Sequence, residues 1–425
     1  MSDAQNSTIT PDQLCVGLYV TLELGWTEHP FAFRNFKIRN QRQLVALKAL
    51  GLNKLKYVPS KSDAQPLQPV AGAAAPTAAP AEVKQAMEEL WKEKHARIAQ
   101  GSTFREAVRR SDKRYLRTTE SAKHVMRELF VRPAEALAGA REIVGDMVQY
   151  FLADQNLAVT LLSDAVASEN AQRHNVNVMV LSLLLARGAG LDAESMKLLG
   201  LGALFHDIGM SKVPGTITGK TEPLTAAERH YHELHPVYGA EMAKRIPDLQ
   251  PEAVDIIRHH HESADGSGFP AHLSGEAITR LTRIVAIADA YDLYCNPQEE
   301  AKALAPAEAM THLYKADRNR FDKQLLSQFI RCMGIYPPGT LVVLSGGAVG
   351  IVVSVNSDNL LQPSLLLYDP TVPRNDAVIF DMREHTDVTV VRAVRANALP
   401  PQAVEYLKPP RRVSFFVDDA GRRIG

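Results

Sequence analysis

The sequence predicts a multidomain, mainly α-helical protein, in which an all-helical domain stands between a small α+β domain and a small β module. Apolar residues recur with helical periodicity over residues 133–335 and alternate with period two after residue 336. A segment rich in alanine and proline separates the first 62 residues from the rest. At 425 residues, the chain is long enough for two or three domains.

Residues 1–62 are expected to form the small N-terminal α+β domain. The stretch "QLCVGLYVTLEL" alternates roughly with period two, as a strand does. The stretch "NQRQLVALKALGLNKLKYV" indicates a short helix that stops at Gly51 and is followed by a strand. Residues 63–81 are rich in alanine and proline, carry almost no charge, and are predicted to be a semi-extended linker.

Residues 82–132 are highly charged and helix-prone, which predicts charged amphipathic helices. Their apolar side chains recur at helical spacing, at Val83, Met87, Leu90, Trp91 and Ile98. Such an apolar face either packs on a neighbouring domain of the same chain or pairs two copies in a homodimer. The sequence leaves both alternatives open.

Residues 133–335 are predicted to form the all-helical domain. The stretches "VNVMVLSLLLARGAG" and "AESMKLLGLGALFHDIG" are apolar over most of their circumference, as core helices are. Thr225 and Glu228 have the spacing of a capping box, which predicts the start of another helix. From residue 336 to residue 425, alternating stretches such as "TLVVLSGGAVGIVVSVN" and "DVTVVRAV" predict a C-terminal β module and tail.

Composition and charge exclude several classes of function. Basic and acidic residues number 48 each, so no overall positive field attracts nucleic acid polymers or anionic membranes. No signal peptide pattern is visible, and the longest apolar runs are far shorter than a membrane span. Cys15, Cys295 and Cys332 are widely spaced, which favours a reducing compartment and hence a soluble, cytoplasmic protein.

The helical domain carries histidines and aspartates near the ends, or inside the apolar faces, of five successive helices. These residues are His174, His206, Asp207, His235, His260, His261 and Asp289. A single histidine at a helix end usually interacts with the last carbonyl groups. A carboxylate inside an apolar helix, such as Asp289, costs several kcal/mol unless it is paired or bound to metal. The coincidence over five helices favours a metal site with imidazole and carboxylate ligands.

Four motifs, "HDIG", "LHPVYGAEM", "HHESADGSGFP" and "RIVAIADAYD", fall in this order and at suitable intervals. Over about residues 160–335 the chain therefore resembles the HD-GYP phosphohydrolases, a group of cyclic di-GMP phosphodiesterases in the HD superfamily. The first 60 residues, with "GWTEHPFAFRNFKIRN", resemble a small domain often found ahead of such modules.

The resemblance implies a site for two divalent ions, iron or manganese, held by the same seven residues. His206 and Asp207 are the expected catalytic residues, and the Asp207 carboxylate is expected to bridge the ions. A hydroxide between the metals would attack the phosphorus of cyclic di-GMP and release pGpG, with GMP as a second product. Because every expected ligand follows residue 170, a chain that starts near residue 130 is predicted to retain the metal.

The resemblance also identifies a loop motif that follows the last two histidines. It comprises Asp265, Gly266, Gly268, Phe269 and Pro270, with phenylalanine where the family usually has tyrosine. The glycines permit positive φ angles, so they are expected to shape the loop. The Gly-Phe-Pro part of the loop is a candidate contact for other signalling proteins.

Three departures from the family pattern concern the substrate and the number of metals. Met210 stands where the family has the lysine of HDIGK, and the Arg-Pro-Tyr-like segment is missing. Lys212 and Arg283 are the remaining candidates for substrate binding. Asn170 stands where some members have a glutamate for a third metal, with Glu169 one place away, which favours two ions. Two alternatives stay open: a receptor that binds a cyclic dinucleotide without efficient hydrolysis, and an enzyme for a different cyclic dinucleotide.

Overall fold

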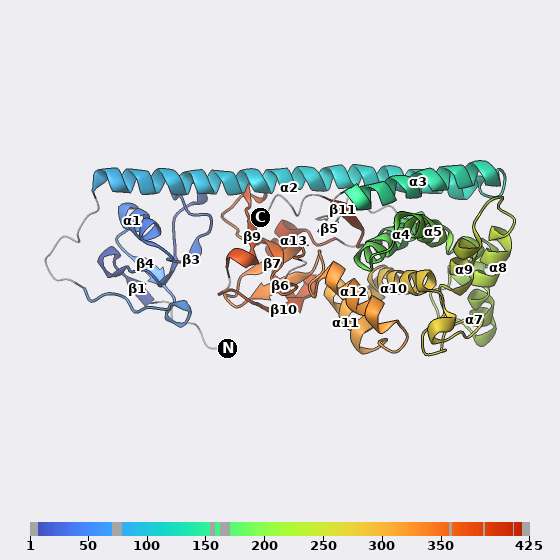
Figure 1. The fold of residues 1–425 in the computed structure, drawn as a ribbon. Coiled ribbons are helices and arrows are strands. Elements are labelled where there is room, and N and C mark those ends of the chain that lie inside the picture. Colours follow the sequence, from blue (N-terminus) through green and yellow to red (C-terminus); the bar gives the residue numbers. More distant parts are fainter. Residues whose placement is uncertain are drawn as a thin grey trace. The chain divides into compact units, whose positions relative to one another are not determined.

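The protein is described here by a computed structural model. The described residues are 7–69, 79–153, 158–161, 171–356, 359–385, 387–410 and 412–418. The chain divides into two compact units, Met1–Ser102 with Leu367–Ile379, and Thr103–Leu366 with Phe380–Gly425. Helices predominate, and within the described residues none is long and apolar enough to cross a membrane (Figure 1).

The N-terminal unit contains a small antiparallel sheet and one short helix. The strands are β1 (Ser7–Ile9), β2 (Tyr19–Thr21), β3 (Asn35–Lys37) and β4 (Leu55–Tyr57), in the order β1-β4-β2-β3. Helix α1 (Gln41–Ala49) begins where the Asn40 side chain accepts a hydrogen bond from the Gln43 amide. The predicted stop at Gly51 is confirmed by its φ of +68°, which favours glycine.

A buried lysine attaches the beginning of helix α2 (Pro80–Glu128) to this sheet domain. The Lys94 ammonium donates to the carbonyl oxygens of Trp26 and His29, and it lies 3.7 Å from the centroid of the Trp26 ring. Burial lowers the pKa of Lys94 to about 8. Residues 70–78 of the predicted linker lie outside the described residues. The predicted charged helices form one continuous helix of 49 residues (Figure 1).

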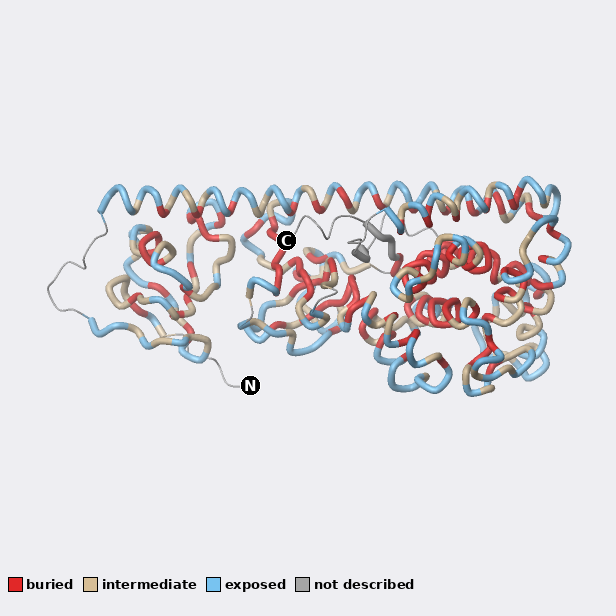
Figure 2. The backbone as a smooth tube through the Cα atoms, in the orientation of Figure 1, coloured by how far each residue is buried: buried red, intermediate tan, exposed pale blue. Residues whose placement is uncertain are grey.

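The second unit is built mainly from helices. Its longer helices after α2 are α3 (Pro133–Ala153), α4 (Ala171–Gly188), α5 (Ala193–Phe205), α7 (Ala226–Glu233), α8 (His235–Ala243), α9 (Pro251–His259), α10 (Arg280–Cys295), α11 (Pro306–Lys315) and α12 (Lys323–Met333). Helix α6 (Gly215–Thr218) and the 3-10 helix η5 (Ile208–Lys212) are short. Helices α4 and α5 are buried over most of their length, as their apolar circumference predicts (Figure 2). The capping box of α7 is confirmed, because Thr225 and Glu228 bond each other's backbone amides at 2.8 and 3.3 Å.

The C-terminal region forms a five-stranded sheet. Its strands are β6 (Leu341–Leu344), β7 (Val349–Ser354), β8 (Ser364–Leu367), β9 (Ile379–Asp381) and β10 (Val390–Val394), in the order β10-β6-β7-β8-β9, and helix α13 (Pro401–Leu407) follows. The expected all-helical domain also contains a strand, β5 (Ala158–Leu161), which pairs antiparallel with β11 (Phe415–Asp418). Periodicity did not predict this pairing, because both strands are short and lie far apart in the sequence.

Close backbone contact fixes the position of η5 on α8, directly after the His206-Asp207 pair. A Cβ atom at Gly209 would lie 1.9 Å from the His235 carbonyl oxygen and 2.5 Å from the Gly239 amide nitrogen. Both obstacles are backbone atoms, which cannot rotate away. Glycine at position 209 therefore lets two elements that carry site residues touch.

We expect Gly209→Ala to lower the free energy of unfolding by about 3 kcal/mol, because the added methyl group must push η5 away from α8. Gly145→Ala is a matched control, since no atom lies within 4 Å of a Cβ atom there and the residue lies inside α3. The control should gain about 0.5–1 kcal/mol from helix propensity. Denaturant unfolding measures both values, and equal midpoints for the two variants would contradict the packing argument.

Candidate metal centre

The seven ligand-type residues converge from five helices. His206 ends α5, Asp207 precedes η5, and His235 begins α8. His260 and His261 follow α9, whereas His174 and Asp289 lie within α4 and α10. His206, His235 and His260 expose at most 1% of their surface, and Asp289 exposes 3%. Histidine and carboxylate side chains at this depth need partners.

One cluster contains His174, His206, Asp207 and Asp289. The Nε2 atoms of the two histidines are 3.2 Å apart. Oδ2 of Asp207 lies 3.8 Å from Nε2 of His174 and 3.7 Å from Nε2 of His206. Oδ1 of Asp289 lies 3.2 and 3.8 Å from the same two nitrogen atoms. Two nitrogens and two oxygens therefore face a common point.

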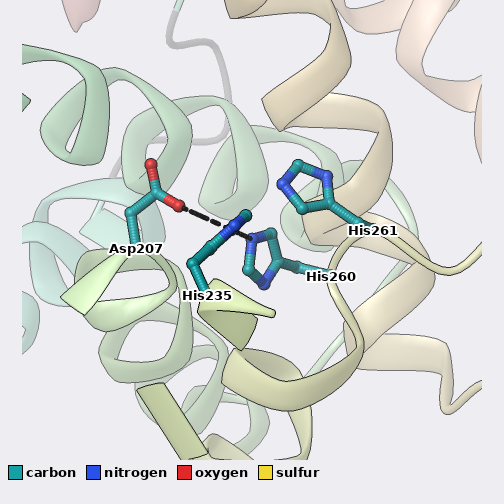
Figure 3. Close-up of side chains that lie close together, drawn as sticks. All are labelled: Asp207, His235, His260 and His261. Atoms are coloured by element: carbon teal, nitrogen blue, oxygen red, sulfur yellow. Dashed lines mark hydrogen bonds and ion pairs between the residues drawn. The ribbon is translucent and has the colours of Figure 1, made fainter. Parts of the chain in front are cut away.

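A second cluster contains His235, His260, His261 and the other oxygen of Asp207 (Figure 3). The Nε2 atoms of His235 and His260 are 3.3 Å apart. Oδ1 of Asp207 lies 3.2 Å from Nε2 of His235 and 3.7 Å from Nε2 of His260. Asp207 is thus shared by the clusters, with one carboxylate oxygen directed to each.

Three of the histidines are oriented by backbone carbonyls of nearby residues. The Nδ1–H groups of His206, His235 and His260 donate to backbone carbonyls three residues earlier, at 2.7, 2.7 and 2.9 Å. A proton on Nδ1 leaves the lone pair on Nε2, which is the atom that faces the clusters. Outer hydrogen bonds of this kind set the tautomer and direction of a metal-binding imidazole.

His174 is oriented by a side chain. Its Nδ1 atom donates to Oδ2 of Asp292 at 2.7 Å. Burial opposes a charge on this ring, but the hydrogen bonds and charges of Asp289 and Asp292 raise the pKa of His174 well above its usual value. A metal ion at His174 must therefore displace a proton.

The two carboxylates indicate that this space suits a cation. Burial alone would raise the pKa of Asp207 and Asp289, yet the surrounding histidines hold both values below the ordinary range. Oδ1 of Asp289 is buried and lies 3.2 Å from Nε2 of His174. An ionised carboxylate oxygen in this position is costly unless a positive charge lies nearby. Five imidazoles with two carboxylates are a donor set that suits divalent transition metals.

The predicted loop motif lies against the second cluster. The Phe269 ring centroid is 4.7 Å from that of His261, and its peptide bond to Pro270 is cis. Gly266 has a φ of +79°, and a Cβ atom at Gly268 would lie 2.4 Å from the His261 carbonyl oxygen. Both glycines are therefore required by the loop conformation.

Two carboxylates anchor the loop, those of Asp265 and Glu262, and the sequence predicted no role for Glu262. Asp265 accepts hydrogen bonds from the amide and hydroxyl of Ser267, at 3.0 and 2.6 Å. The buried Glu262 carboxylate accepts from the amides of Ala271 and Leu273, at 2.6 and 2.9 Å. A glutamate directly after three histidines was the available signal for this anchor.

A cavity of about 110 Å³, open to solvent, adjoins the clusters. Its lining includes His261, Asp289, Tyr294 and Arg320. The Arg320 side chain is 44% exposed, with Nη1 3.6 Å from Asp317 and a 3.4 Å hydrogen bond to Ser263. Most of its donors therefore remain available to a ligand, and no sequence motif pointed to this arginine.

The two cations expected to bind substrate do not line this cavity. Arg283 donates to Asp322 at 2.7 Å and to Glu276 at 3.3 Å, so its guanidinium is already paired. Lys212 lies exposed at the end of η5. Glu169 and Asn170, which bear on a third metal, lie outside the described residues.

The chain is similar to several known proteins. Residues 160–325 match a family described as HD domain, and residues 7–140 match a domain of unknown function, DUF3391. A cyclic di-GMP phosphodiesterase of Pseudomonas aeruginosa is 29% identical over 84% of this chain and 83% of its own length. A 3'3'-cGAMP-specific phosphodiesterase of Vibrio cholerae is 28% identical over 42% of each chain. A solved HDG"Y"P protein of Bdellovibrio bacteriovorus matches 76% of this chain and 98% of its own, with 18% identity and a TM-score of 0.44.

We expect Asp207→Ala to weaken divalent metal binding at both clusters, because this residue supplies an oxygen to each. His235→Ala removes a nitrogen from the second cluster only, so it should spare the first. Asp146→Ala, which changes an exposed aspartate of α3, is the control. Elemental analysis of the purified proteins measures the metal content, and parent-like content in Asp207→Ala would contradict the shared position.

Proposed function

Because the chain belongs to the HD domain family over residues 160–325 and is of the HD-GYP type, we propose that it hydrolyses cyclic di-GMP to pGpG, with GMP as a second product. The proposal rests on one observation above all. Asp207 lies between two histidine clusters and directs a different carboxylate oxygen to each. This is the arrangement expected of a bridging ligand in a two-metal site.

Two divalent ions are proposed to occupy the clusters, and iron or manganese suits the mixed nitrogen and oxygen donors. Such ions, when bound, lower the pKa of a water molecule between them and neutralise charge on phosphoryl oxygens. The residues of the chain hold and orient this centre. The Nδ1 bonds fix the imidazoles, and the cavity beside Asp289 gives a phosphodiester access to the clusters.

Arg320 is proposed to bind the substrate from the wall of this cavity. Its guanidinium contacts Asp317 at 3.6 Å and Ser263 at 3.4 Å, and Arg320 lines the same cavity as Asp289. A planar guanidinium suits phosphate oxygens and guanine edges, because it offers paired donors. Binding by Lys212 or Arg283 stays a prediction, and for Arg283 the ion pair with Asp322 must first open.

Two alternatives have a specific basis. The resemblance to a 3'3'-cGAMP-specific enzyme makes this mixed dinucleotide a second candidate substrate. Met210 stands where the family has a lysine, so the chain lacks a cation three residues after Asp207. This is what a receptor that binds the cyclic dinucleotide without efficient hydrolysis would show. We also propose that the Gly-Phe-Pro loop contacts other signalling proteins. A further part of the proposal is that the chain forms a homodimer. So is a cytoplasmic location, which the three free cysteines support.

We expect the metal-loaded protein to hydrolyse cyclic di-GMP, and Met210→Lys to raise kcat by up to about 10²-fold, because the added charge stabilises developing negative charge. Met210→Gln changes the same position without a charge and should leave kcat near the parent value. Chromatography of products from cyclic di-GMP and 3'3'-cGAMP measures rate and preference. Tight nucleotide binding with turnover no higher than in the metal-stripped protein would favour the receptor.

Arg320→Ala should raise KM about 10–100-fold with a smaller effect on kcat, because it deletes charged hydrogen bonds to bound substrate. Arg318→Ala is the matched control, since its guanidinium lies 5.6 Å from the Tyr314 ring and does not line the cavity. Steady-state kinetics of both variants distinguish the outcomes. An unchanged KM for Arg320→Ala would exclude this arginine from the substrate site.

A further inference from the structure

We propose that Tyr115, on the long helix α2, is a positioning residue of the metal centre and acts on His174 through Asn177 and Asp292. The inference rests on the proposed function only in taking His174 as a ligand of one of two metal ions. It concerns the second compact unit alone, because all four residues lie in Thr103–Leu366.

Three buried hydrogen bonds connect these residues. The Tyr115 hydroxyl donates to Oδ1 of Asn177 at 2.7 Å, and Nδ2 of Asn177 donates to Oδ1 of Asp292 at 2.7 Å. Oδ2 of Asp292 accepts the Nδ1–H of His174, also at 2.7 Å. Tyr115, Asn177 and Asp292 are each 1% exposed. Hydrogen bonds at this depth face little competition from water.

The Tyr115 hydroxyl stabilises one orientation of the Asn177 amide. The two hydrogens on Nδ2 of Asn177 go to Asp292 and, at 3.3 Å, to the carbonyl of Val413. A rotated amide would turn its oxygen toward the Asp292 carboxylate and withdraw one donor from each of these two acceptors, which also accept from Asn296 at 2.9 and 2.7 Å. In the observed orientation Oδ1 of Asn177 accepts from the Tyr115 hydroxyl, so the oxygen and the nitrogen of the amide are both paired.

Asn177 in turn holds the carboxylate that sets the tautomer of His174. Asp292 accepts from Asn177, from His174 and, at 2.9 Å, from Nδ2 of Asn296. These donors fix the direction of the carboxylate. The carboxylate keeps a proton on Nδ1 of His174, so that the Nε2 lone pair is directed to the first cluster.

Only the first cluster should depend on this connection. His206, His235 and His260 donate their Nδ1–H to backbone carbonyls three residues earlier, so α2 is not involved. His174 instead depends on a residue of α2. Tyr115 lies outside residues 160–325, the HD domain match, and inside the 7–140 match. A chain that starts near residue 130, which the sequence predicts to retain the metal, lacks Tyr115 and should therefore bind one ion more weakly.

The test compares full-length Tyr115→Phe with the parent by calorimetric titration of the metal-free proteins with Mn²⁺. One of the two ions should bind about 10–100-fold more weakly, the usual effect of changing an outer hydrogen bond, and the other should bind as in the parent. Thr340→Val is the control, because it deletes a buried hydroxyl that bonds only the Pro337 carbonyl. Both ions should bind the control unchanged.

Asn296→Ala provides a second variant if Tyr115→Phe does not fold. It removes another donor to Asp292 from a half-buried position, and selective weakening of the same ion is expected. Thermal unfolding of the metal-free proteins separates positioning from simple stability. Unchanged affinity for both ions, or equal weakening of both together with a lower Tm, would overturn the proposal. A parent that binds both ions but hydrolyses no cyclic dinucleotide would overturn the proposed function and leave the positioning role to stand on the binding data.

Discussion

The helical domain depends on how two carboxylates, the buried Asp289 and the half-buried Asp207, are compensated. Both lie among imidazole rings, with Asp289 3.2 Å from His174 and Asp207 3.2 Å from His235. Histidines bind metal in the neutral form, so in the functional state the rings cannot supply the missing positive charge. Cations must supply it. Metal ions then replace the protonated rings as partners of these carboxylates, and folding and metal binding are therefore coupled.

The helices are arranged to meet this constraint. Ligands at the ends of α5 and α9 and at the start of α8 reach a common point, while the apolar faces of α4 and α5 form the core around them. Short elements such as η5 keep successive ligand residues close to one another. Gly209 has no side chain, which allows η5 to contact α8. Packing of the core and geometry of the metal site are therefore determined by the same helices.

Local patterns predicted much of the fold and most of the ligand positions. Helical periodicity, the cap at Thr225 and the stop at Gly51 depend on neighbours within a few residues, so the sequence displays them directly. The pairing of β5 with β11 and the place of Arg320 beside Asp289 depend on tertiary contacts. Asp292 resembled an ordinary polar residue one turn beyond Asp289, because only the folded chain brings it to His174. Periodicity alone could not reveal these long-range partners.

The carbonyl bonds behind His206, His235 and His260 affect how the site can adapt to different metals. His206 and His260 lie three residues after their carbonyl acceptors in α5 and α9, so a small rigid-body shift of either helix carries the ligand and its orientation together. The acceptor of His235 is the His232 carbonyl of α7, the helix directly before α8. Ions of different radius can then be accommodated by sub-ångström helix movements without loss of the tautomer. A centre built in this way selects its metal weakly by size, and the ion it holds in a cell will depend strongly on which metals are available there.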